Sequence, residues 1–170
     1  MRNIAKVGVV ASVLAALFVA GIVSYPASLQ AAAQHDNHDA SAATYASAEG
    51  RAVLVHITSG NAKDTHQVHA ATMGVDHALA FLKSGKTVSI MLDVDGVKIA
   101  AKTVPDELKA INTELKSFLA EGGRVIACEH CIMVAGLTTS DMLPGVEIDS
   151  HPLMPRTQSI LDSGAVVLDY

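Results

Sequence analysis

Short apolar runs alternate with stretches of helical apolar spacing from residue 51 to residue 170, and this alternation limits the possible folds more than any other feature. Strands are predicted where the runs are short and bounded by turn residues, at 52–57, 86–92, 124–127, 146–148 and 165–168. Helices are predicted at 65–83, 105–119, 131–137 and 155–162. Strands that alternate with helices form a mainly parallel sheet covered on both faces. The sequence therefore predicts an α/β three-layer sandwich of five strands, with a flavodoxin-like fold as the nearest general architecture.

The first 33 residues have the pattern of an export signal. Two basic residues, Arg2 and Lys6, precede an uncharged apolar run over 7–23, and Ala31 and Ala33 supply the small residues that a signal peptidase requires. A signal peptide at 1–33 places the folded part in the periplasm or elsewhere outside the cytoplasm. An uncleaved run would instead be an N-terminal membrane anchor.

Residues 34–50 are rich in Ala, Ser and short polar residues and show no sustained period. This composition predicts a flexible linker. The remaining residues, 51–170, are enough for one folded domain with its own core.

Charge and aromatic content argue against nucleic-acid binding. The chain has 17 acidic against 12 basic residues, a formal net charge of −5, no Trp and 4% aromatic residues. Neutralising phosphates needs clustered Lys and Arg, and stacking on bases needs aromatic side chains. We therefore expect no nucleic-acid partner. The sequence also lacks a glycine-rich phosphate loop and a Gly-x-Ser-x-Gly elbow, so no nucleotide cofactor or serine hydrolase activity is expected.

Ligands and catalytic groups of parallel sheets gather where the strands end at their carboxyl termini. Four segments follow predicted strands in this way, at 58–64, 93–98, 128–131 and 149–155. The functional site is predicted among these segments.

The most specific chemical feature is the segment Cys128-Glu129-His130-Cys131, which follows a predicted strand and opens a predicted helix. Unpaired N–H groups at such a turn stabilise a thiolate, the nucleophilic form of cysteine, and His130 and Arg124 can add positive charge. The spacing also permits a disulfide within one turn. We therefore predict Cys128 and Cys131 as the catalytic residues, with two small buried apolar residues as the alternative interpretation.

A second interpretation of this region is a metal site. His66 and His69 are three residues apart near the start of a predicted helix, which places both on one face. A soft nitrogen–sulfur site for zinc or copper would combine these two histidines with the later segment, as His66, His69, Cys128, His130 and Cys131. Met133 is a further candidate ligand, although its helical spacing is more typical of a core residue.

Other polar residues near the predicted site have simpler explanations. Asp93 and Asp95 follow the second predicted strand and are interpreted as turn residues. His56 is expected to pack or to face solvent. His151 could supply a proton and Arg156 an anion contact, but a rigid surface loop explains both.

Several pieces of the chain together resemble the DsrE/DsrF-like family of sulfur-trafficking proteins. They cover residues 52–170 and are found at 58–60, 81–92, 95–97, 122–128, 136–137 and 143–146. The segment from Cys128 to Gly136 and Leu137 is the most telling of them. The resemblance implies an α/β fold and assembly into a homo-oligomer, a trimer or a hexamer. It also implies that Cys128, at the end of its strand, matches the cysteine that accepts persulfide sulfur in the sulfur-relay members.

The sequence thus leads to one main hypothesis and two alternatives. The main hypothesis is an exported sulfurtransferase or sulfur carrier without a cofactor, which exchanges sulfane sulfur with a donor and an acceptor through a persulfide on Cys128, with Cys131 as the resolving thiol. The first alternative is a non-catalytic zinc- or copper-binding or redox-sensing module. The second is an oligomeric scaffold without chemistry at Cys128.

Overall fold

The computed structural model describes residues 50–170. The predicted signal peptide (1–33) and the predicted linker (34–50), apart from Gly50, lie outside the described residues and stay predictions. Within 50–170, no helix combines the length and the apolar character needed to cross a membrane.

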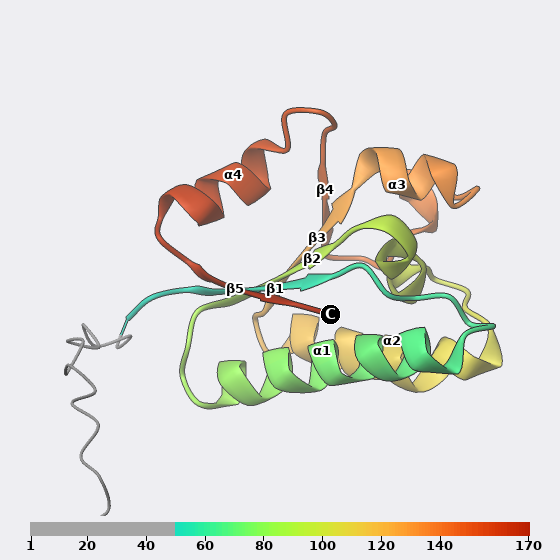
Figure 1. Cartoon of the computed structure of the whole chain (residues 1–170), viewed down its shortest axis with the longest axis horizontal. Coiled ribbons are helices and arrows are strands. Elements are labelled where there is room, and N and C mark those ends of the chain that lie inside the picture. The colour runs from blue at the N-terminus through green and yellow to red at the C-terminus, as the bar shows by residue number, and fades with distance from the viewer. Residues whose placement is uncertain (1–49) are drawn as a thin grey trace, which may run out of the picture. The chain divides into compact units, whose positions relative to one another are not determined.

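Five strands form one sheet in which every neighbouring pair is parallel. The order across the sheet is β4-β3-β2-β1-β5 (Figure 1). The strands are β1 (Val53–Ile57), β2 (Val88–Leu92), β3 (Arg124–Cys128), β4 (Val146–Asp149) and β5 (Val166–Asp169). All five residues of β2 are buried, as expected for a central parallel strand that is covered on both faces.

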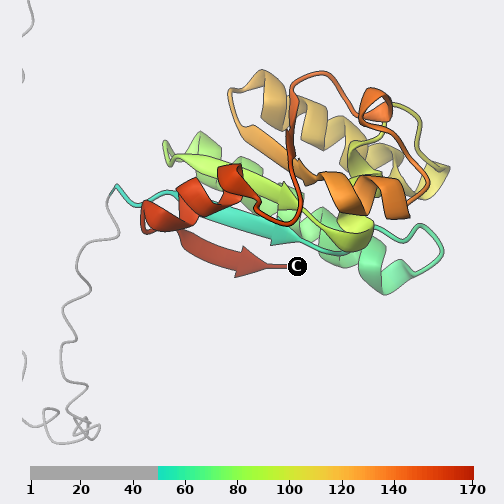
Figure 2. The ribbon, with the colours of Figure 1, turned by 90° about the horizontal axis from the view of Figure 1, so that it is seen from above.

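The direction of each crossover decides which face a helix covers. α1 (Thr65–Lys83) and α2 (Lys109–Ala120) connect β1 to β2 and β2 to β3, and they pack side by side on one face (Figure 1). The connection from β4 to β5 runs back across the sheet, so a right-handed crossover places α4 (Pro155–Asp162) on the opposite face (Figure 2). The remaining elements are α3 (Glu129–Val134) and the 3₁₀ segments η1 (Val94–Ala100), η2 (Asp106–Leu108) and η3 (Thr139–Asp141).

The sheet divides the core into a large and a small half. The large half lies under α1 and α2 and includes Ile90, Leu115 and Phe118. The small half lies under α4 and consists of Leu54, Met91, Ile126, Cys128 and Ile160. Cys128 therefore belongs to the thinly covered face, at the point where its strand ends.

The three-layer α/β sandwich and the parallel sheet confirm the predicted fold class. Each predicted strand and helix is present, with small shifts at the ends. The helix predicted at 131–137 begins at Glu129, because Cys128 itself caps it. The segment after β2 was predicted as a loop but forms η1, and the last strand lies beside β1 at the edge of the sheet.

Asp149, the last residue of β4, ties α4 to the sheet. Its fully buried carboxylate accepts hydrogen bonds from the backbone N–H groups of Arg156 (3.0 Å) and Thr157 (2.9 Å) and from the Thr157 hydroxyl (2.7 Å). Burial raises the pKa of Asp149, but these hydrogen bonds more than offset it, so the pKa lies below its ordinary value. The carboxylate thus satisfies N–H groups at the start of α4 that lack partners within the helix.

Replacing this carboxylate should destabilise the domain. Asp149→Ala leaves two part-buried N–H groups and the Thr157 hydroxyl without their partner, which costs about 1–3 kcal/mol in the free energy of unfolding. Asp162→Ala, at the exposed end of the same helix, should change it by less than about 0.5 kcal/mol. Because the folded pKa of Asp149 is lowered, its contribution is present above about pH 4 and is lost as the pH falls through the folded pKa. Denaturant unfolding of both variants at several pH values checks this, and equal losses in the two variants would contradict the assigned role of Asp149.

Candidate functional site

The carboxyl ends of the strands bring polar side chains together on the α4 face. Side chains alternate along a strand, so His56 on β1 shares this face with Leu54, and Cys128 on β3 shares it with Ile126. His56 is in register with Asp169 of β5. The site therefore draws residues from segments that are more than 100 positions apart in the sequence.

Cys128 is both the last residue of β3 and the cap of α3. Its side chain accepts a hydrogen bond from the backbone N–H of Cys131, with a distance of 3.4 Å between N and Sγ. The residue is only 2% exposed. The sulfur atom therefore lies at the inner wall of the site, with a backbone donor directed at it.

Cys131 has a different environment, although it lies only one helical turn further on. Its thiol donates a hydrogen bond to Oδ1 of Asp93 over 2.7 Å. Burial raises the pKa of the Cys131 thiol, and hydrogen bonding to Asp93 and Cys128 raises it further, to about 12. Cys131 therefore keeps its proton at neutral pH.

The Asp93 carboxylate is the acceptor that holds this proton in place. Burial raises the pKa of Asp93, but hydrogen bonds from Cys131 and from the Val94 N–H, together with the charge of His56, more than offset the effect. The pKa of Asp93 is consequently below its ordinary value. Cys131 and Asp93 thus form a thiol–carboxylate pair rather than a thiolate–carboxylic acid pair.

The backbone around Asp93 is held against the end of β1. The Asp93 N–H donates to the Ile57 carbonyl at 3.0 Å, and the Gly96 N–H donates to the Thr58 carbonyl at 3.1 Å. A Cβ atom on Gly96 would collide with the Ile57 carbonyl, so only glycine permits this close approach. Val94 has a φ of 47°, a strained conformation for a β-branched residue. Such strain is typical of segments that position functional groups.

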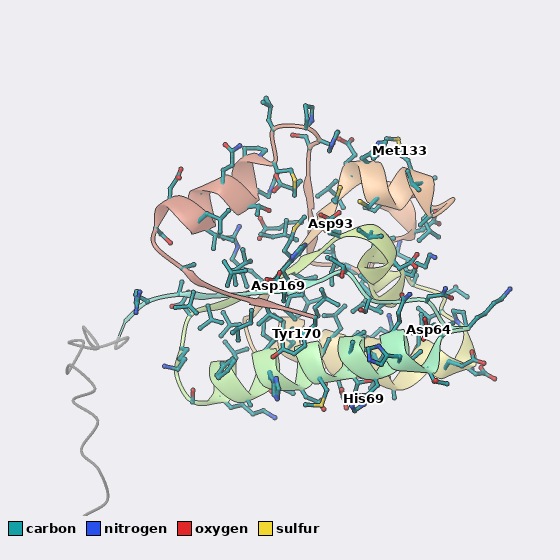
Figure 3. All side chains as sticks on the ribbon, in the orientation of Figure 1. Asp64, His69, Asp93, Met133, Asp169 and Tyr170 are labelled. Atoms are coloured by element: carbon teal, nitrogen blue, oxygen red, sulfur yellow. The ribbon has the colours of Figure 1, made fainter. Side chains whose placement is uncertain are left out.

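Behind Asp93, a histidine and a second carboxylate continue the line of polar groups. His56 Nδ1 lies 2.7 Å from Oδ1 of Asp169, and His56 Nε2 lies 3.7 Å from Oδ2 of Asp93. Figure 3 shows Asp93 and Asp169 at neighbouring positions where the strands end. The imidazole is therefore held between two carboxylates.

Three of these residues are not predicted from the sequence. Asp93 has the pattern of a turn residue, His56 that of a packed or solvated residue, and no pattern assigns a role to Asp169. Their positions at or just after the ends of predicted strands were the available signal. The register that pairs His56 with Asp169 could not be predicted, because β5 reaches β1 only through the long crossover of α4.

The structure places the predicted metal ligands apart from the cysteines. His66 and His69 are exposed on α1, on the other side of the sheet from Asp93 (Figure 3). Within residues 50–170, the group of metal-ligating atoms that lie within 4.8 Å of one another consists of Asp93, Cys128 and Cys131. The five-residue nitrogen–sulfur set predicted above is therefore not assembled in this structure.

His130 and Met133 lie on the outer surface of α3. His130 is exposed and stacks on His151, with ring centroids 4.9 Å apart. Met133 is 61% exposed, so the interpretation of this residue as part of the core is wrong. The short helix α3 buries Ile132, holds Cys131 part-buried against Asp93, and exposes His130, Met133 and Val134.

A pocket of about 250 Å³ opens beside Cys131. It lies between η1 and α3 and is lined by Val94, Asp95, Lys98, His130, Cys131, Val134 and Ala135. Lys98 forms an ion pair with Asp95. Cys131 lines this pocket and Cys128 does not, although the two sulfur atoms lie within 4.8 Å of one another.

Removing the charge of Asp93 should make Cys131 more reactive. We compare Cys128→Ser/Asp93→Asn with Cys128→Ser, so that Cys131 is the only thiol in both proteins. Loss of a neighbouring negative charge lowers the thiol pKa by about 1, which increases the rate of alkylation at neutral pH about tenfold. Cys128→Ser/Asp95→Asn is the matched control and should react like Cys128→Ser. Equal rates in all three proteins would show that Asp93 does not hold the thiol proton.

Comparison with known proteins identifies a family and a relative that the domain resembles. The model of the DsrE/DsrF-like family matches residues 53–158. The uncharacterized protein MK0008 of Methanopyrus kandleri is 36% identical over 72 residues, and the match spans 42% of this chain and 60% of that protein.

Two solved structures share the fold. The protein of unknown function MTH1491 from Methanobacterium thermoautotrophicum has a TM-score of 0.54 at 16% identity, covering 70% of this chain and 98% of its own. The ychN protein of E. coli has a TM-score of 0.55 at 20% identity, covering 71% and 99%. The family match, which spans most of the described domain, shows that this chain belongs to the DsrE/DsrF-like family.

Proposed function

We propose that the protein carries sulfane sulfur as a persulfide on Cys128 and that Cys131 is the resolving thiol. The observation that carries this proposal is the unequal bonding of the two cysteines. The Cys128 sulfur accepts a backbone N–H, whereas the Cys131 thiol donates its proton to Asp93. An N–H donor favours a negatively charged sulfur, and a carboxylate acceptor favours a protonated one. Cys128 is therefore the nucleophile of the pair.

Membership in the DsrE/DsrF-like family supports the same choice. The family is related to sulfur relay, and the relay cysteine of the members that this chain resembles matches Cys128 by position. Cys128 lies inside the matched residues 53–158 and at the carboxyl end of a central strand. Family and geometry thus indicate the same sulfur atom.

Loading transfers one sulfur atom without a net change of redox state. The Cys128 thiolate attacks the outer sulfur of a donor persulfide, the sulfur–sulfur bond of the donor breaks, and the donor leaves as a thiolate. Unloading to an acceptor thiolate is the reverse reaction with a different partner. Only 2% of Cys128 is exposed, so the reacting sulfur of a donor or an acceptor has to reach a nearly buried atom.

A persulfide on Cys128 can also react with Cys131. When Cys131 loses its proton, its sulfur attacks the inner sulfur of the Cys128 persulfide, a Cys128–Cys131 disulfide forms, and the outer sulfur leaves as hydrogen sulfide after taking up the proton. The two thiols are oxidised and the sulfane sulfur is reduced, so no other oxidant is needed. The Cys131 proton is held by Asp93, which slows this step and extends the lifetime of the persulfide.

Export and self-assembly complete the proposal. The signal-peptide pattern of residues 1–33 supports a location outside the cytoplasm, where a disulfide between the two cysteines is stable once formed. Assembly into a trimer or a hexamer, as the family resemblance implies, is supported by exposed apolar side chains on α4 and β5, namely Leu161, Val166 and Val167. The mass of the purified protein in solution tests this part.

The sulfur proposal is tested by intact mass after incubation with a small persulfide donor. A bound sulfane sulfur adds about 32 Da that is lost on reduction. Cys128→Ser should lose the adduct, and Cys131→Ser should keep it longer than the wild type, because its resolving thiol is missing.

Two results of this experiment would contradict the proposal. One is an adduct of wild-type size on Cys128→Ser together with none on Cys131→Ser, which would reverse the two roles. The other is a wild-type protein that never gains sulfur and only becomes about 2 Da lighter through a disulfide, which would indicate the thiol redox module instead. Circular dichroism of each variant is the control for retention of the fold.

A further inference from the structure

Three side chains from two segments place metal-ligating atoms around one point. The atoms belong to Asp93, Cys128 and Cys131, and all lie within 4.8 Å of one another. Zinc bound to sulfur at about 2.3 Å and to carboxylate oxygen at about 2.0–2.2 Å requires ligand atoms roughly 3.5 Å apart. The separations between the ligand atoms therefore need to change by roughly 1.3 Å at most for the three side chains to share an ion.

A proton currently joins two of these ligands. The Cys131 thiol donates it to Asp93 Oδ1 over 2.7 Å, so one sulfur and one oxygen already point at a common position. A metal ion at this position replaces the proton, which leaves to solvent, and the sulfur–oxygen distance opens to that of two ligands on one ion. Cys128 supplies the second sulfur from the buried side.

The residues behind Asp93 provide the outer support that metal-binding carboxylates need. His56 Nε2 lies 3.7 Å from the second oxygen of Asp93, and Asp169 holds the other ring nitrogen of His56 at 2.7 Å. His56 is hydrogen-bonded to Asp169 and lies within ion-pair range of Asp93. Polar groups outside the ligand shell help to orient a ligand and increase metal affinity. His56 thus stands on the side of the Asp93 carboxylate that does not accept the Cys131 proton, and the Val94 N–H holds the oxygen that does.

We propose that Asp93, Cys128 and Cys131 bind one zinc ion. Two thiolates and one carboxylate are a donor set that suits zinc, and water or a small ligand in the pocket beside Cys131 takes the remaining coordination position. This site differs from the predicted one, because it uses Asp93 and none of His66, His69 and His130. It does not rest on the sulfur chemistry, but zinc and sulfane sulfur require the same Cys128 sulfur and so exclude each other.

Zinc binding to the full chain, reduced and free of sulfur adducts, tests the site. Competition with a chromophoric zinc chelator gives the stoichiometry and the affinity. The wild type should bind one zinc ion at this site, and Asp93→Asn and Cys131→Ser should each weaken binding by at least tenfold. His56→Gln, which removes only the outer support, should weaken it by about tenfold.

Matched controls separate this site from the other histidines and acidic residues of the chain. Asp95 lines the same pocket, and the Asp95→Asn protein should bind zinc like the wild type. A variant with His35, His38, His66 and His69 all replaced by Ala should also keep the site. Cobalt in place of zinc should give thiolate-to-metal charge-transfer absorption that Cys131→Ser reduces.

The zinc site can fail its test independently of the sulfur proposal. A wild-type protein with two free thiols that binds no zinc would overturn the metal site, whether or not it accepts sulfur. Zinc binding that survives Asp93→Asn and disappears in the histidine variant would also overturn it. Zinc bound as expected should protect Cys128 from the persulfide donor, and full sulfur loading of the zinc-bound protein would contradict a shared site.

Discussion

All neighbouring strands are parallel, so the carboxyl ends of all five strands lie at the same edge of the sheet. His56, Asp93, Cys128, Asp149 and Asp169 stand at or just after these ends. Because side chains alternate along each strand, the register also decides which of them share a face. A change of one residue in the pairing of β1 with β5 would turn Asp169 away from His56. The chemistry of the site therefore depends on the sheet as a whole.

The two cysteines have different hydrogen-bond partners, although they lie only one helical turn apart. Cys128 belongs to the strand and accepts an N–H, while Cys131 belongs to the first turn of α3 and donates to Asp93. The carboxylate comes from a different segment, which is held in place by the close contact of Gly96 with the end of β1. The proposed nucleophile and a second thiol that is hydrogen-bonded to Asp93 thus come from one four-residue motif and one distant segment. The Asp93 carboxylate that accepts the Cys131 proton is also the third ligand of the zinc site proposed above.

Much of the fold, and the two cysteines of the candidate site, could be predicted from the sequence. The apolar runs and the helical spacings gave the strands, the helices and the parallel sheet, because these patterns reflect burial directly. The motif at 128–131 gave the two cysteines, because few residue types support sulfur chemistry. Asp93 was missed because an aspartate after a strand is more often a turn residue. His56 and Asp169 were missed because their pairing depends on the position of β5, which no local pattern reveals.

The proposed sulfur chemistry requires that Cys128, and not Cys131, carries the sulfur. The most direct measurement locates the sulfur in the wild-type protein after brief exposure to a small persulfide donor, blocking of all thiols and persulfides by alkylation, and cleavage after glutamate. Cleavage after Glu129 separates the two cysteines into different peptides. The account predicts the added sulfur on the peptide that ends at Glu129. Sulfur found only on the peptide that begins at His130 would contradict it.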